Sequence, residues 1–269
     1  MGIIKTIKKK YRGLVFITRW YGYRAINLIQ KGIDTFNREE KPSSKMLVEI
    51  CAIVKDENDY LPEWIDHHLK LGFDRIVIYD NNSKKKFPGS EKVIVKNWPE
   101  KNSQMKCYLK HATTTEADWT AYIDVDEFIF LNQDKNVKDF INRFTALGRN
   151  GKEIRALYLY WLMYGANGHF AKPKGGVVDN FTKPCRSAAP HTKIIAKSKY
   201  IRMFIHPHDA NIIGDKLDVP LEVAQINHYF TKSLEEWREK INRGRADEKR
   251  KRDFNEFYLY NDDMKADDK

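Results

Sequence analysis

The amino-acid sequence predicts an α/β fold with a mostly parallel central sheet flanked by helices. Apolar runs of strand length alternate with helical patterns between residues 47 and 123, and this alternation is typical of parallel strands joined by right-handed crossovers. Polar clusters directly follow three of the apolar runs, at residues 55–58, 80–83 and 124–127. Ligands bind beyond the carboxyl ends of parallel strands, so the clusters predict one shared binding edge.

The first half of the body carries the clearest elements. Residues 47–54 (LVEICAIV) form an uninterrupted apolar run, as expected for a strand buried on both faces. A helical face then begins at Leu61; Asp56 or Asn58 is a candidate cap, and Gly72 a candidate end. Further elements are expected as strands at 75–79, 93–96 and 119–123 and a helix over 102–117.

The second half is less regular. A glycine-rich loop occupies residues 165–176, and the pattern from Ser233 to about Phe257 predicts one long, charged helix containing the sequence RGRAD. Apolar runs predict strands at 153–161, 193–197, 200–206 and 223–229.

Charge divides the chain into a basic arm and a body. Residues 1–45 contain 11 Lys and Arg against three Asp and Glu, a formal charge of +8 out of +11. Apolar residues recur at helical spacing over 13–36, so residues 1–36 are a candidate for binding an anionic membrane surface; the alternative is a helix packed on the body. We therefore predict an arm at 1–45, a folded domain at 46–260 and a polar tail at 261–269.

Composition limits the remaining classes of protein. Hydrophobic residues make up 42% of the 269, which suffices for a core and argues against global disorder. The three cysteines, Cys51, Cys107 and Cys185, form no CxxC motif, so a reduced, cytoplasmic compartment is expected. We expect no cleavable signal sequence and no membrane span, because no apolar stretch suits either.

The strongest local signal for chemistry is the sequence IDVDEF, in which Asp124 and Asp126 follow an apolar strand. Residues i and i+2 share a face, so the two carboxylates can point the same way. A divalent cation relieves their repulsion, and Mg²⁺ and Mn²⁺ prefer such oxygen ligands and bridge to substrate phosphates. A solvated acidic turn is the alternative, but the position at a strand end favours a metal site.

Four other polar residues each have a functional and a structural interpretation. His228 follows an apolar run, where histidine is more often structural, although a carboxylate and imidazole site suits Mn²⁺. Asp80 ends a strand and can bind a nucleobase or ribose, or cap a turn. Arg243 and Arg245 can grip a diphosphate, or belong to a solvated helix face.

Several segments in order resemble bacterial glycosyltransferases similar to families 2 and 92. They are CAIVKDENDYLPEWIDHHLKLGFDRIVIYDNNS, the segment Gln104–Tyr108, DWTAYIDVDEFIFL, WLMYGANGH and INHYFTKSLEEWREKINRGRAD. The resemblance spans about residues 47–257. It implies a GT-A fold, with a Rossmann-like nucleotide-binding half and an acceptor-side half.

The resemblance also implies roles for individual residues. Asp126 matches the ligand of a Mn²⁺ or Mg²⁺ cofactor, Asp124 a contact to the ribose or the metal, and His228 the C-terminal metal-ligand histidine. The glycine loop beside the donor sugar matches Gly165, Gly168 and His169. The nucleotide side matches Lys55, Glu57, Asp80, Asn82, Ser83 and Gln104, with Arg243 and Arg245 in the last matching segment. Similar chains often carry Asn at the position of Asp56.

The general base is expected on the acceptor side. An inverting transfer needs a carboxylate to deprotonate the acceptor hydroxyl. The segment GGVVDNF (175–181) aligns with one that usually carries Glu and then Arg; here Asp179 and Asn180 take those positions. An aspartate is shorter than a glutamate, so its carboxylate would be displaced. His206 and His208 share one face of a likely strand end and are rival candidates for base or metal ligand.

The expected reaction is a metal-dependent, inverting transfer of a hexose from a UDP-linked donor to a saccharide or glycolipid acceptor. The resemblance suggests synthesis of surface polysaccharide or lipopolysaccharide, in the cytoplasm or on the inner face of a bacterial inner membrane. The alternatives are a metal-dependent nucleotidyltransferase or a nucleic-acid-binding enzyme. Against a nucleic-acid partner, the charge is concentrated in the arm and the sequence contains no DNA-binding motif. A membrane-surface scaffold without catalysis leaves the three polar clusters unexplained.

Overall fold

The computed structural model describes residues 46–145, 153–185, 191–243 and 252–261. All of them belong to one compact unit. The predicted arm at 1–45 lies outside these ranges, as does most of the predicted tail. Asn261 is buried, and its Oδ1 accepts a hydrogen bond of 2.5 Å from the backbone N–H of Ala166. The folded domain therefore includes the first residue of the predicted tail.

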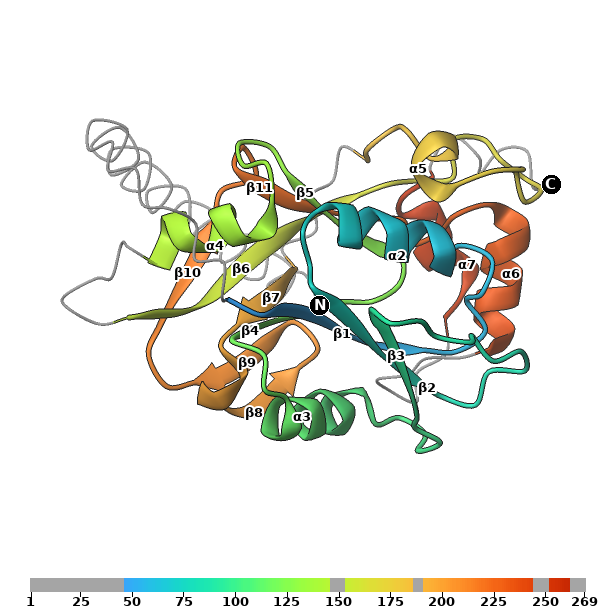
Figure 1. Cartoon of the computed structure of the whole chain (residues 1–269). Helices are drawn as coiled ribbons and strands as arrows, with labels where there is room; N and C mark the ends of the chain where they lie inside the picture. The colour runs from blue at the N-terminus through green and yellow to red at the C-terminus, as the bar shows by residue number, and fades with distance from the viewer. Residues whose placement is uncertain (1–45, 146–152, 186–190, 244–251, 262–269) are drawn as a thin grey trace, which may run out of the picture. The chain divides into compact units, whose positions relative to one another are not determined.

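A nine-stranded sheet forms the centre of this unit (Figure 1). Its strands are β1 (Val48–Val54), β2 (Arg75–Asp80), β3 (Val93–Asn97), β4 (Trp119–Tyr122), β5 (Glu127–Leu131), β6 (Ile154–Met163), β7 (Thr192–Ala196), β10 (Asp215–Val219) and β11 (Ala224–His228). They are ordered β3-β2-β1-β4-β7-β6-β11-β5, with β10 also paired to β6.

Most of the strand pairings are parallel. β1 pairs in parallel with β2 and β4, β2 with β3, and β6 with β10 and β11. Antiparallel pairings join β7 to β4 and β6, and β5 to β11. The α/β fold with a mostly parallel sheet, which the sequence predicts and the GT-A resemblance implies, is confirmed.

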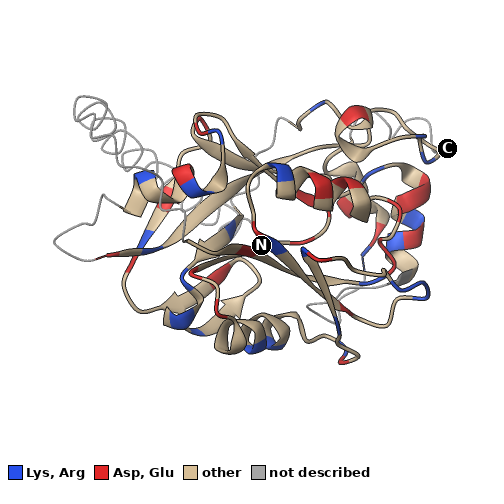
Figure 2. Ribbon diagram, in the orientation of Figure 1, with Lys and Arg blue, Asp and Glu red and all other residues tan. Residues whose placement is uncertain are grey.

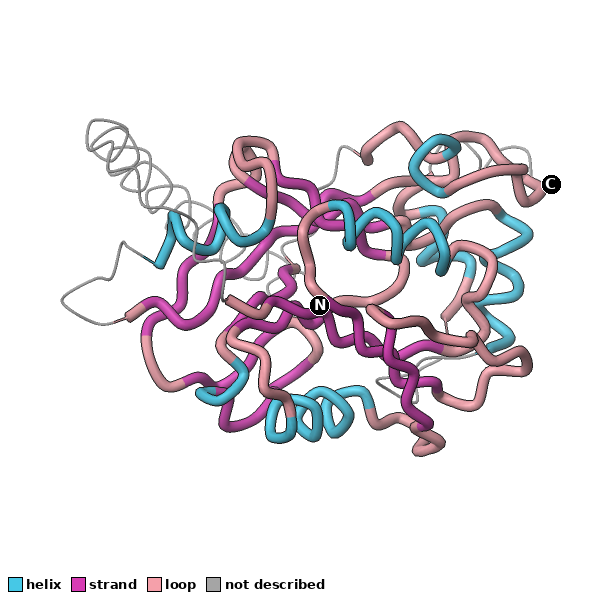
Figure 3. The backbone as a smooth tube through the Cα atoms, viewed as in Figure 1, coloured by secondary structure: helices cyan, strands magenta, loops and turns pink. Residues whose placement is uncertain are grey.

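Helices cover both faces of the sheet. They are α2 (Leu61–Lys70), α3 (Gln104–Thr114), α4 (Val137–Thr145), α5 (Val177–Asn180), α6 (Leu234–Arg243) and α7 (Phe254–Tyr258). α2 and α3 lie on opposite faces of the sheet, and α3 packs against β1 and the separate hairpin of β8 (Ile201–His206) and β9 (Asp209–Ile212) (Figures 1 and 3). No helix within the described ranges combines the length and apolar character needed to cross a bilayer.

The central strand β1 shows why the apolar run at 47–54 folds as it does. Every residue of β1 is buried, as expected for a strand covered on both faces. Its one acid, Glu49, accepts hydrogen bonds from Arg75 Nε at 2.5 Å and His111 Nε2 at 2.7 Å. Burial raises the pKa of Glu49, but its hydrogen bonds to His111 and Thr115 outweigh this and lower the pKa to about 2. The carboxylate is thus ionised and paired inside the core.

One long helix from Ser233 to Phe257 was expected, and this prediction is wrong. α6 ends at Arg243, and the backbone of Asp253 is extended, with φ −138° and ψ 176°. Asp253 instead caps α7, accepting a hydrogen bond of 3.0 Å from the backbone N–H of Glu256. The apolar residues that fitted one helical pattern lie on two helices, which pack Trp237 near Phe257. Nor did the sequence predict β5, β9, β10, α4 and α5.

Candidate active site

Six strands end at one edge of the sheet. β1 to β4 run parallel, β6 shares their direction because β7 is antiparallel to both β4 and β6, and β11 is parallel to β6. Their carboxyl ends lead into the three polar clusters of the sequence, the glycine-rich loop after β6, and His228. The structure therefore brings the predicted clusters to a single edge, as expected for an open α/β sheet.

Strand pairing sets Asp126 beside His228. In the antiparallel pair of β5 and β11, His228 lies opposite Glu127, and the N–H of Tyr229 donates to the carbonyl oxygen of Asp126 at 2.9 Å. The Oδ1 atom of Asp126 is 3.5 Å from Nε2 of His228. Burial lowers the pKa of His228, so its imidazole is neutral near pH 7, the form that ligates metals.

Asp124 has different partners from Asp126. Its Oδ1 accepts hydrogen bonds from Gln104 Nε2 at 2.6 Å and the Tyr108 hydroxyl at 3.2 Å, and its Oδ2 accepts one from Lys193 at 2.7 Å. Burial raises the pKa of Asp124, but the Lys193 ammonium outweighs this and holds the pKa below its ordinary value. Asp124 and Asp126 therefore lie in one turn, and their carboxylates are held by different side chains.

Lys240 of α6 is the principal partner of Asp126. Its Nζ is 2.6 Å from Oδ2 of Asp126 and 2.7 Å from the carbonyl oxygen of Phe230. Burial raises the pKa of Asp126, yet Lys240 and His228 together hold it well below its usual range. Burial also lowers the pKa of Lys240 to about 8, against the opposing effect of Asp126.

The donor atoms at Asp126 suit a divalent cation that is completed by a substrate. Among the described residues, no group of three or more His, Cys, Asp or Glu side chains is arranged to hold a metal alone. Asp126 Oδ1 and His228 Nε2 are nevertheless 3.5 Å apart, close enough to bind one ion. Mg²⁺ and Mn²⁺ are commonly held by one or two protein groups plus phosphates and waters. We conclude that Asp126 and His228 fit such an ion and that Asp124 has other partners.

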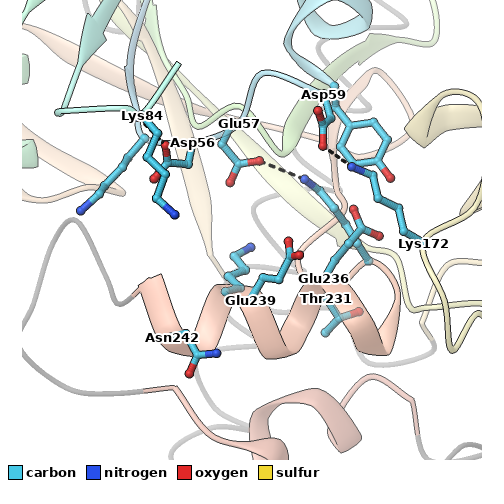
Figure 4. Close-up of a pocket in the computed structure, with 13 residues that line it drawn as sticks. Asp56, Glu57, Asp59, Lys84, Lys172, Thr231, Glu236, Glu239 and Asn242 are labelled. Carbon is cyan, nitrogen blue, oxygen red and sulfur yellow. Dashed lines mark hydrogen bonds and ion pairs between the residues drawn. The ribbon is translucent and has the colours of Figure 1, made fainter. Parts of the chain in front are cut away.

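A pocket of about 590 Å³ opens beside Lys240 (Figure 4). Figure 4 shows Asp56 and Lys84 on one side of it, Asp59 and Lys172 on another, and Glu236, Glu239 and Asn242 along α6. The remaining lining residues are Lys55, Glu57, Tyr60, Thr231, Lys232 and Lys240. Five lysines and five acids line this pocket, and charges of both signs also occur along α6 (Figure 2).

Two residues of the pocket wall have backbones in the left-handed region. Asp56 (φ 52°) and Lys232 (φ 53°) are both non-glycine residues, and such strain is concentrated at functional sites. The Nζ of Lys232 lies 3.1 Å from Oε2 of Glu57. Burial lowers the pKa of Lys232, but Glu57 and Asp126 outweigh it and raise the pKa. Lys232 is therefore a buried cation held at the pocket by acids from two strand ends.

The clusters after β1 and β2 are tied together. The backbone N–H of Asp56 donates to Ser83 Oγ at 3.0 Å, and Asp56 Oδ1 accepts from the N–H of Lys84 at 2.7 Å. Asp80 caps its own turn through the N–H of Ser83 at 3.2 Å and pairs with Lys86. Asn82 is exposed and donates to the carbonyl oxygen of Pro99 at 3.1 Å.

The glycine-rich loop is fastened to the start of α6. The N–H groups of Leu234 and Glu235 donate to the carbonyl oxygens of His169 and Phe170, at 3.1 and 2.9 Å. Gly165 has no room for a Cβ, which would lie 2.7 Å from Asn261 Oδ1, and Gly168 has φ +78°. These contacts bring the loop's Lys172 to the pocket.

The base candidates lie in different surroundings. Asp179 is exposed on α5 and is not among the residues that line the pocket. His208 packs on Trp161, with ring centroids 4.8 Å apart, and Trp161 packs on His228 at 4.2 Å. Burial lowers the pKa of His208 to about 3, so it is neutral at physiological pH. His206 is exposed, and its ring lies 5.6 Å from that of His208.

The two arginines of the last segment are not placed by the structure. Arg243 ends α6, but its side chain is outside the described part of the chain, as is the whole of Arg245. Their predicted contact with a diphosphate stays a prediction.

Comparison with known proteins identifies the family. The model of glycosyltransferase family 92 matches residues 45–265. The chain belongs to glycosyltransferase family 92. The match covers all the strand ends and loops described above, so the site geometry is that of a family 92 member.

Relatives of this family 92 chain are found among plant proteins. A family 92 protein of Oryza sativa subsp. japonica is 27% identical over 217 residues, covering 71% of this chain and 34% of the relative. One from Ricinus communis is 27% identical over 226 residues, covering 77% and 39%, and one from Arabidopsis thaliana is 28% identical over 223 residues, covering 74% and 38%. The chain thus spans little more than a third of these relatives' length.

Solved structures resemble the chain only distantly. Staphylococcus aureus TarS with UDP-GlcNAc has a TM-score of 0.45 at 13% identity, over 80% of this chain and 64% of that one. HddC from Yersinia pseudotuberculosis has a TM-score of 0.42 at 11% identity, over 72% and 97%. Glucosyl-3-phosphoglycerate synthase from Mycobacterium tuberculosis, with Mn²⁺ and UDP-glucose, has a TM-score of 0.34 at 12% identity, over 58% of each chain.

The sequence did not predict that three lysines of the site are buried. Lys193 precedes the apolar run of β7, and Lys232 and Lys240 lie in a stretch rich in charge, where solvated lysines are the rule. Only the ordered match of INHYFTKSLEEWREKINRGRAD to the family carried a signal for the last two.

Proposed function

We propose that this family 92 chain transfers a sugar from a nucleotide-sugar donor to a hydroxyl group. The observation that supports this most strongly is the position of Lys240, which lines the pocket with its Nζ 2.6 Å from Oδ2 of Asp126, while Oδ1 of Asp126 lies 3.5 Å from Nε2 of His228. The pocket carries five lysines among five acids, so ammonium donors for a diphosphate lie near a carboxylate and imidazole pair that suits its metal ion.

The residues of the site would have distinct roles in this transfer. Asp126 and His228 would hold Mn²⁺ or Mg²⁺, which would neutralise charge on the departing diphosphate. Asp124, fixed by Gln104 and Lys193, would bind the donor's ribose or support the metal. The pocket lysines would hold the phosphates in the orientation that leaves the sugar carbon open to the acceptor.

The finer features of the reaction follow the family resemblance. We propose a UDP-hexose donor, a saccharide or glycolipid acceptor and inversion at the sugar carbon, in the synthesis of a surface polysaccharide or lipopolysaccharide. Incubating the protein with a panel of nucleotide sugars and Mn²⁺ tests the proposal. Release of nucleoside diphosphate that stops in EDTA and resumes with Mn²⁺ is expected. No release from any donor, or release of pyrophosphate instead, would count against it.

The base is tested by Asp179→Asn. A base acts on the acceptor in the transition state, so turnover should fall at least tenfold, about 1.4 kcal/mol of barrier, while the affinity for UDP is unchanged. Steady-state kinetics with acceptor and a UDP titration measure the two quantities. Unchanged turnover would move the role to His208 or His206, and substitution of each by Gln is then the decisive comparison.

The arm is proposed to attach the protein to an anionic membrane surface. Each basic residue near such a surface contributes on the order of 1 kcal/mol, and salt screens this attraction. The whole chain should sediment with anionic liposomes at low salt and partly dissociate at high salt. A chain beginning at Lys45 should stay in the supernatant and still hydrolyse donor. Equal sedimentation of the two chains would remove the membrane proposal.

A further inference from the structure

Two buried lysines neutralise the acid pair, but they differ in what else they face. Lys193 is fully buried, with its Nζ 2.7 Å from Asp124 and 3.5 Å from Glu127, and it does not line the pocket. Lys240 is about nine-tenths buried, lies 2.6 Å from Asp126 and does line the pocket. Of the two, Lys240 is the lysine that a bound ligand can reach.

The contacts of Lys240 occupy the same carboxylate that a metal ion would use. Its Nζ donates to Oδ2 of Asp126 and to the carbonyl oxygen of Phe230. An ammonium has three protons, so one donor direction remains beyond these two contacts. Oδ1 of Asp126 meanwhile faces Nε2 of His228 at 3.5 Å. Thus Oδ2 of Asp126 binds the Lys240 ammonium, and Oδ1 of the same carboxylate faces the candidate metal position.

Two cations sharing one carboxylate repel each other. Inside a protein the repulsion between charges about 4 Å apart is several times stronger than in bulk water, so a divalent ion beside an ammonium is strongly disfavoured. A diphosphate supplies negative charge for both cations at once. The arrangement therefore opposes metal binding in the empty site and favours it when a diphosphate is present.

We propose that the Lys240 ammonium pairs with the Asp126 carboxylate in the free protein and turns to the donor's diphosphate when metal and donor bind. The metal ion and the donor therefore each bind poorly without the other. This inference rests on the proposed function and deepens it, because it assigns the coupling of metal and donor to one residue. Linkage requires the coupling to be reciprocal: Mn²⁺ must tighten UDP binding by the same factor by which UDP tightens Mn²⁺ binding, and removing Lys240 must reduce that factor.

The test compares the whole chain with its Lys240→Met variant, using Mn²⁺ alone, UDP alone in EDTA, and both together. Removal of the competing cation should tighten Mn²⁺ binding, followed by electron paramagnetic resonance, by about tenfold or more, which is 1.4 kcal/mol. Loss of the remaining N–H of Lys240 as a phosphate donor should weaken UDP binding in EDTA by a similar factor, because hydrogen bonds from an ammonium to a phosphate are among the stronger ones. Lys240→Arg keeps the charge and should stay near the parent value for Mn²⁺.

A structural role for Lys240 would give a different pattern. If the lysine only held α6 in place, both affinities would fall in the variant, and that result overturns the proposal, as does unchanged Mn²⁺ affinity. Lys70→Met removes an exposed lysine from α2 and serves as the matched control with both affinities unchanged. Should Lys240→Met fail to fold, Lys240→Gln takes its place, because its amide can still donate to Phe230.

A second readout does not depend on nucleotide. Mn²⁺ should raise the melting temperature of Lys240→Met more than that of the parent, because the ion then supplies the charge that Asp126 has lost. An equal or smaller rise contradicts the proposal. If the parent chain binds neither Mn²⁺ nor UDP under any condition, the proposed function fails; if it binds both and the variant does not diverge, only this inference fails.

Discussion

Asp126→Asn should abolish Mn²⁺-dependent release of nucleoside diphosphate while the protein remains folded. The substitution removes the charged oxygen that faces His228 and leaves Lys240 without its carboxylate. Metal stabilisation of a leaving diphosphate amounts to several kcal/mol, so activity should fall by about 10³-fold or more. Donor hydrolysis, Mn²⁺ binding and circular dichroism measure activity, ligand loss and folding separately.

The matched control is Asp66→Asn on α2. Asp66 is exposed and pairs with Lys70 one turn along the helix, so its loss should leave both activity and Mn²⁺ binding intact. Activity of Asp126→Asn within about tenfold of the parent, or full parental activity in EDTA, would show that the reaction does not use a metal at Asp126.

Lys193→Met should destabilise the protein more than any other single change to a lysine of the site. Its ammonium projects from the start of β7, in reach of the carboxylates of Asp124 and Glu127, and is fully buried. Burial raises the pKa of Glu127 well above its ordinary value, so the main charge left unpaired is that of Asp124. Breaking a buried pair by removing one partner costs about 3–5 kcal/mol.

Urea unfolding of three variants checks this expectation. Lys70→Met, an exposed counterpart, should change the free energy of unfolding by less than about 0.5 kcal/mol. Lys193→Met combined with Asp124→Asn should lose less than the sum of the two single variants, because neither partner is then left charged without the other. Additive losses would mean that Lys193 does not pair with Asp124 in solution.

Much of the fold could be predicted because its signals are local. The apolar run at 47–54 became β1, buried along its whole length, and the strands at 75–79, 93–96 and 119–123 match β2, β3 and β4 to within two residues. Alternation with helices then indicated that these strands run parallel to one another. The prediction of one long helix from Ser233 was wrong because the helical periodicity of the sequence continues across the break between two helices. Asp253 caps a second helix, and its carbonyl oxygen accepts a hydrogen bond from Trp237 of the first.

The sequence by itself determined the edge of the sheet at which the polar clusters meet, because parallel strands carry their carboxyl ends to one side. Tertiary structure alone decided which charges meet there. Lys193, Lys240 and Lys232 reach their acids across separations of 69, 114 and 175 residues. Strand register places His228 opposite Glu127, and the end of α6 brings Lys240 to Asp126. Ion pairs between residues so far apart in the sequence produce no periodic pattern. Whether a lysine is buried or solvated depends on the segments that pack around it, and these are brought together only by the tertiary fold.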